Sequence, residues 1–100
     1  MKTLTDQPGY QNCKIAVAIR AARAAMGWSQ QTFAERMGVA KSTIARIETL
    51  EISPRGDFVL RAISLFREAG LEIDIQSERG IPITIGSGAI LSALDQLNAN

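Results

Sequence analysis

The sequence predicts a mainly α-helical domain of four to five helices, followed by a β-hairpin and a short last helix. Between about residues 12 and 69, apolar residues recur at steps of three and four, and glycines separate the successive runs. Between residues 71 and 85, apolar and polar residues alternate instead, which is the period of a half-buried strand. With 100 residues, 46% of them hydrophobic, the chain can bury one modest core. We therefore expect a flexible arm over 1–10, a helical domain over 11–70 and an extension over 71–100.

The first predicted helix begins near Asn12 and ends at Gly27, because a left-handed helix cap carries no side-chain penalty for glycine. Its apolar face consists of Ile15, Ile19, Ala22 and Met26. Ser29 is a good N-cap for a second helix, which is expected to end at Gly38. The apolar side of this second helix consists of Phe33, Ala34 and Met37.

A third short helix is predicted over 41–49. Its inward side carries Ile44 and Ile47, and its outward side carries Lys41, Ser42, Ala45 and Arg46. The outward side is therefore small and polar around two cations.

The remaining elements follow a loop over 51–56. A fourth helix is predicted from about Asp57 to Ala69, strands over 71–76 and 81–85, a turn at 77–80, and a last helix over 89–97. Because Pro82 has no amide donor, the second strand is expected to lie at an edge.

The composition argues against an enzyme. The chain has no histidine, which removes the commonest general base and the commonest metal ligand. The single cysteine, Cys13, excludes an intramolecular disulfide and a multi-cysteine metal site, and we expect it to be a partly buried, inert thiol. No cofactor and no metal are therefore expected. The sequence lacks both a membrane-spanning apolar run and the apolar segment of a signal peptide, which predicts a cytoplasmic protein.

Charge is divided unevenly along the chain. Residues 11–50 carry six cations and two acids, a net charge of +4, whereas residues 51–100 carry four arginines and seven acids, a net charge of −3. A basic half joined to an acidic half suggests one surface for an anion and another for a different partner.

The segment from Ser29 to Glu48 resembles the helix-turn-helix of the Xre/Cro family, which includes lambdoid phage repressors. The resemblance extends from about Ile15 to Leu71. It rests on the small Ala34 where two helices cross, on the turn glycine and on the apolar positions after it. It implies a lambda-repressor-like fold and a transcriptional regulator that binds double-stranded DNA sequence-specifically, as a dimeric repressor of its own operon or of other genes. In such folds the second helix of the motif, here 41–49, enters the major groove.

Carried over residue by residue, the resemblance places Lys41, Ser42 and Arg46 at the base-reading positions, and Gln30 and Thr43 at phosphate-contacting positions. Their chemistry fits these roles, because Arg46 can donate two hydrogen bonds to guanine and Lys41 one. The alternative interpretation is that Lys41, Arg46 and Gln30 are ordinary surface residues. Ser42 would then only begin the helix.

Further candidates and two departures from the family pattern concern the ends of the third helix. Ala45 is a candidate contact for a thymine methyl group. Ala40 replaces the usual Ser or Thr cap, and Thr49-Leu50 replaces the Asn-Gly that often ends this helix in the family. Arg55, in the loop that follows, is therefore a candidate DNA contact only.

The other conspicuous residues of the helical domain have structural interpretations. Arg20, Arg23 and Arg36 are expected to be solvated or ion-paired, and Trp28 is expected to fill the core.

The strands, with the helix over 89–97, are the candidate dimer interface, and the strand residues expected there are isoleucines: Ile73, Ile75, Ile81, Ile83 and Ile85. A lone two-stranded hairpin is barely stable in water, so the strands must pack either on their own helical domain or on a second chain. The alternative to a plain homodimeric repressor is an antitoxin, which the helix-turn-helix followed by Leu71–Ile75 also resembles. It would bind both operator DNA and a toxin protein. A protein-binding adaptor on the same fold is a third possibility.

Overall fold

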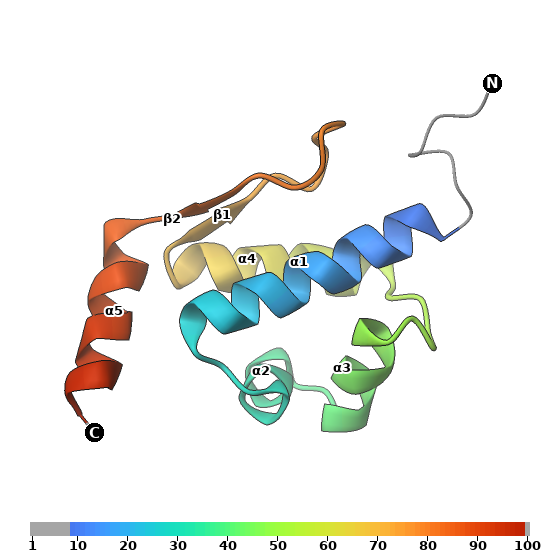
Figure 1. Ribbon diagram of the computed structural model, residues 1–100. Helices are drawn as coiled ribbons and strands as arrows, with labels where there is room; N and C mark the ends of the chain where they lie inside the picture. Colours follow the sequence, from blue (N-terminus) through green and yellow to red (C-terminus); the bar gives the residue numbers. More distant parts are fainter. Residues whose placement is uncertain (1–8, 100) are drawn as a thin grey trace.

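The computed structural model describes residues 9–99, which form five helices and one antiparallel hairpin (Figure 1). The helices are α1 (Tyr10–Met26), α2 (Gln30–Met37), α3 (Lys41–Glu48), α4 (Gly56–Glu68) and α5 (Ser87–Asn98), and the strands are β1 (Leu71–Ile73) and β2 (Ile83–Ile85). The mainly helical fold with a hairpin and a last helix is thus confirmed. No helix of residues 9–99 is long and apolar enough to cross a membrane.

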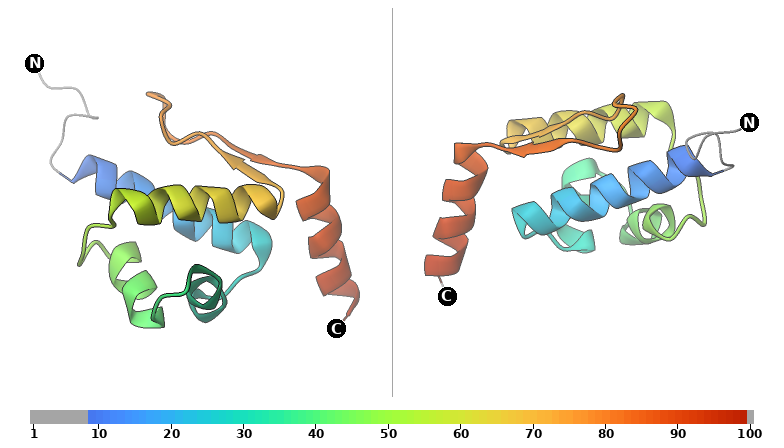
Figure 2. Two further views of the ribbon diagram at one scale, coloured as in Figure 1. Left: turned by 180° about the vertical axis from the view of Figure 1, so that it is seen from behind. Right: turned by 45° about the horizontal axis from the view of Figure 1, so that its top comes forward.

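The molecule is layered, with the hairpin on one side of the long helices α1 and α4 and the short helices α2 and α3 on the other (Figures 1 and 2). Stacked aromatic rings fill the centre. The ring centroid of Phe66 lies 5.1 Å from that of Phe33 and 5.4 Å from that of Trp28. Trp28 is therefore a core residue, as predicted, and the guanidinium of Arg36 covers its ring at 4.6 Å.

The ends of the first two helices follow the local sequence signals. Gly27 and Gly38 both adopt left-handed conformations, with φ of 70° and 72°, and their N–H groups donate to the last carbonyls of the helices before them. The Ser29 hydroxyl accepts a hydrogen bond from the N–H of Thr32 at 3.0 Å. α1 begins at Tyr10, two residues before the predicted start. The predicted flexible arm otherwise lies outside the described residues.

The two strands are shorter than predicted. They pair only as Leu71 with Ile85, Glu72 with Thr84 and Ile73 with Ile83. The Asp74 carboxylate accepts a hydrogen bond from the Gln76 N–H at 3.1 Å, and this local turn leads the chain out of the ladder. Pro82 lies at an edge as predicted, and its carbonyl accepts from the Asp74 N–H at 3.0 Å.

The hairpin packs on the helices of its own chain. The buried Lys14 of α1 donates from Nζ to the carbonyl of Ser77 at 2.8 Å, which holds the tip of the hairpin against α1. Four of the five isoleucines predicted at a dimer interface are half-buried against this domain: Ile73, Ile75, Ile81 and Ile83. Ile85 is the exception, at 48% exposed.

The turn after α3 has a left-handed residue that is not glycine. Leu50 has φ of 65° and is the only described non-glycine residue with a positive φ. Its N–H donates to the carbonyl of Ile47 at 3.2 Å, and the N–H of Glu51 donates to that of Arg46 at 2.8 Å. A leucine in this region is strained, because its Cβ approaches the following carbonyl.

Replacing Leu50 by glycine is therefore expected to raise the free energy of unfolding by about 0.5–1 kcal/mol, since the strain disappears and the side chain is half exposed. Chemical denaturation measures this change. The matched control is Leu60→Gly at an exposed position inside α4, where glycine is expected to cost about 1 kcal/mol. A loss of stability in Leu50→Gly would contradict the assignment of strain.

Candidate nucleic-acid interface

Helix α3 presents one polar face to solvent. Lys41, Ser42 and Arg46 are exposed, and Ala45 between them is half-buried. The isoleucines on the opposite side are at most 2% exposed, which fixes the rotation of the helix about its axis. The fold therefore brings the predicted base-reading side chains together on one face. No side chain caps the start of α3, where the N–H of Thr43 donates to the carbonyl of Ala40 at 3.0 Å.

A groove of about 330 Å³ runs between α3, the loop after it and the start of α4. Thr43 and Arg55 both line it. Arg55 Nε lies 3.4 Å from Asp57 Oδ1, but both side chains are more than 60% exposed. Such an exposed ion pair is worth little, so Arg55 is free to exchange this carboxylate for a phosphate.

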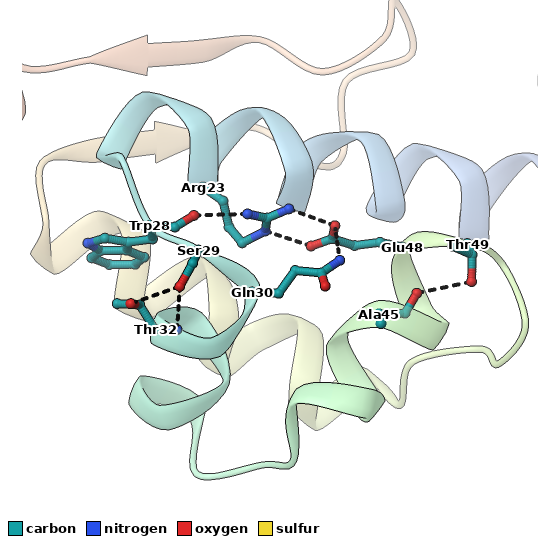
Figure 3. A network of polar contacts seen from close by, with 8 residues as sticks. All are labelled: Arg23, Trp28, Ser29, Gln30, Thr32, Ala45, Glu48 and Thr49. Carbon is teal, nitrogen blue, oxygen red and sulfur yellow. Dashed lines mark hydrogen bonds and ion pairs between the residues drawn. The ribbon is translucent and has the colours of Figure 1, made fainter.

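The other predicted phosphate contact, Gln30, belongs to a network that joins α1, α2 and α3 (Figure 3). Its Nε2 donates to Glu48 Oε1 at 3.1 Å. Glu48 also accepts from Arg23, at 2.7 Å from Nε to Oε2 and at 2.8 Å from Nη2 to Oε1. The third Arg23 nitrogen, Nη1, donates to the carbonyl of Trp28 at 2.9 Å. Because an amide nitrogen carries two hydrogens, Gln30 still has one to donate outward.

This network holds α3 at a fixed distance from α1. The side chains of Arg23 and Glu48 are 17% and 4% exposed, and two parallel hydrogen bonds orient the pair. The hydrogen bond to Glu48 raises the pKa of the Arg23 guanidinium above its ordinary value, with burial opposing and the charge of Glu48 adding to the rise. A raised pKa means that this stabilisation is complete below the unfolded value and is lost only far above neutral pH.

Glu48 is the residue that sequence reasoning missed. By composition it is only one of two acids in the basic half of the chain. It lies, however, next to Ile47 and one turn after Ile44, on the inward side of α3. A carboxylate at an inward position needs a buried partner, because burying an unpaired charge is costly. The inward position of Glu48 was therefore the signal in the sequence for a buried ion pair. Its partner is Arg23, which is expected from the sequence to be solvated or ion-paired.

Cys13 is exposed, not partly buried as expected, because it lies on the side of α1 that faces an open groove beside the hairpin tip. In the described part of the chain, no group of three or more acidic or cysteine side chains is placed to hold a metal ion.

Comparison with known proteins gives one match. A family model described as helix-turn-helix matches residues 19–69, from the middle of α1 to the end of α4. No curated protein and no solved structure is similar to the chain. The hairpin and α5 lie outside the matched residues.

Proposed function

Because this chain belongs to the Xre/Cro-like helix-turn-helix family, whose domain binds DNA, we propose that it is a sequence-specific transcriptional repressor acting on double-stranded operator DNA. It would repress by occupying an operator, including one upstream of its own gene. Such a protein works where its DNA is, in the cytoplasm.

The polar face of α3 carries this proposal. Lys41 and Arg46 supply cationic donors suited to guanine, and Ser42 is a short donor and acceptor between them. Ala45 lies on the same face and offers its methyl group to thymine. A helix whose other side is fixed in the core presents these groups as a rigid reader for the major groove.

Phosphate contacts would set the register of this reader. Gln30 stands at the start of α2, and Thr43 and Arg55 line the groove beside α3, so the three flank the polar face on two sides. Contacts of this kind position a protein on DNA without reading sequence. Residues 11–70 would thus form the DNA-binding unit, with residues 71–100 serving dimerisation or partner docking.

A two-fold dimer is part of the proposal, since operators of this class consist of two half-sites about one helical turn, roughly 34 Å, or a multiple of it apart. Its interface is expected in the extension, where the strand isoleucines and α5 gather apolar surface.

Fluorescence anisotropy on the DNA upstream of the gene and on a scrambled control, at two salt concentrations, tests this function. We expect specific affinity to exceed nonspecific affinity by about 10³-fold or more. Equal and steeply salt-dependent binding to both fragments would contradict a specific operator at this site. Co-purification of a neighbouring gene product at one-to-one stoichiometry would favour the antitoxin function instead, and absence of DNA binding at low salt would favour an adaptor.

A further inference from the structure

Helix α5 turns its small side chains toward the domain and its large apolar side chains toward solvent. Ala89 is 1% exposed and packs at the start of the helix against Gly70. The outward side chains are Ile90, Leu91, Leu94 and Leu97, which are 58%, 60%, 49% and 73% exposed. We call these four residues the α5 stripe. A helix that packs only on its own domain turns its large apolar side chains inward, so this orientation is the reverse of the usual one.

The stripe is held in a fixed place. The N–H of Gly86 donates to the carbonyl of Gly70 at 2.8 Å. A Cβ on Gly70, whose φ is 102°, would lie 2.8 Å from the backbone nitrogen of Ala89, so only glycine permits this approach. Further along, Gln96 lies against Gly27 at the end of α1. α5 therefore stands at one end of the molecule, beside the end of α1 (Figure 2).

The pattern of the stripe suits a second copy of itself. Ile90, Leu94 and Leu97 follow each other at steps of four and three, the spacing of a seam between two helices. Asp95 is the only ionisable side chain of α5. The helical repeat places it at the edge of the stripe, one turn after Leu91, and away from the seam. Two copies therefore meet without bringing like charges together, whereas a strongly basic partner would find no acidic cluster here.

The area of the stripe also fits a dimer. A Leu or Ile side chain offers on the order of 100 Å² of apolar surface. The four exposed fractions, with that of Ile85 beside them, then leave about 300 Å² of apolar surface open per protomer. Two such patches supply about 600 Å² of apolar surface. Because roughly 60% of an interface is apolar, this amount corresponds to a total of about 1,000 Å², the lower limit for a specific interface.

We propose that the α5 stripe packs antiparallel against the α5 stripe of a second copy of this chain, across a two-fold axis that passes near Leu94. The inference rests on the proposed function, which requires a two-fold dimer, and narrows its expected interface from the strands and the last helix to the last helix. The four half-buried strand isoleucines would then support α5 without forming the contact themselves, whereas the exposed Ile85 would lie at its edge.

Leu94→Glu tests the interface, with Leu60→Glu as the matched control on α4 at 68% exposure. Sedimentation equilibrium of the full chain is expected to show at least a tenfold rise in the dimer dissociation constant for Leu94→Glu and no change for Leu60→Glu. Thermal unfolding of each variant checks that the domain remains folded. A dimer as tight as that of the unaltered protein, or an unaltered protein that is monomeric, overturns the inference.

Disulfide trapping tests the symmetry. In a Cys13→Ser background, Leu94→Cys is expected to form a covalent dimer under mild oxidation, because a residue on the axis meets its own copy. Ser92→Cys, exposed on another side of α5, is the control and is expected to trap far less. Equal trapping at both positions overturns the two-fold arrangement. If Leu94→Glu leaves the dimer intact while the unaltered protein still discriminates operator DNA, this inference fails and the proposed function stands. If the protein dimerises through α5 but does not discriminate operator DNA, this inference stands and the proposed function fails.

Discussion

Replacing Glu48 by alanine is expected to lower the free energy of unfolding by about 3 kcal/mol. The Glu48 side chain is 4% exposed and accepts two hydrogen bonds from Arg23 and one from Gln30. Removal of Glu48 leaves the largely buried guanidinium of Arg23 without a carboxylate partner. Because Arg23 keeps some contact with water, the expected loss lies at the low end of the range for broken buried pairs. Urea denaturation followed by circular dichroism measures it.

The control for this experiment is Glu72→Ala, which breaks the exposed ion pair of Glu72 with Arg67. That pair is 3.5 Å long, and its side chains are 62% and 58% exposed. We expect a change within about 0.5 kcal/mol. Glu48→Gln, which keeps one acceptor oxygen for Arg23 but replaces the other by an NH₂ donor and loses the charge, is expected to fall between the two. If Glu48→Ala costs no more than Glu72→Ala, the network does not hold α3 in place.

Replacing Arg46 by alanine is expected to weaken operator binding by about 1–3 kcal/mol at each half-site, roughly 5- to 150-fold, and to relax discrimination at one base pair. The side chain is exposed on the polar face of α3, and Ala is compatible with a helix. Folding should therefore be unaffected, so that the loss reports on DNA contact. Anisotropy titrations on the operator and on single-base variants measure both effects.

Arg79→Ala is the matched control for Arg46→Ala. Arg79 is exposed in the turn of the hairpin. The hairpin lies on the opposite side of α1 and α4 from α3 (Figure 1). Its loss removes one positive charge from the protein, as the loss of Arg46 does, but no predicted DNA contact. An equal loss of affinity on every sequence for Arg46→Ala would make Arg46 a phosphate contact, and equal effects of both variants would remove it from the interface.

Much of the candidate site could be predicted from the sequence because its determinants are local. Hydrogen bonds within a few residues end or begin the helices at Gly27, Ser29 and Gly38. The limits of α2 can therefore be predicted without knowledge of the fold. The rotation of α3 follows from the spacing of its isoleucines, which also places its polar residues together. The ends of the strands were harder to predict. The apolar alternation of the sequence continues past Asp74, but the turn that the Asp74 side chain forms there ends the strand pairing.

The sequence by itself determined the order of the elements, the family of residues 19–69 and the polar face of α3, because helical periodicity and caps act over one or two turns. Only the tertiary structure decided which buried charged side chains pair with each other. Arg23 and Glu48 are 25 residues apart and meet because α1 and α3 pack together. It also decided which apolar surface is left open. The strands and α5 carry similar numbers of isoleucines and leucines, but packing covers most of the strand side chains and leaves the α5 stripe in water. Burial depends on what else reaches the same space, and no local pattern contains that information.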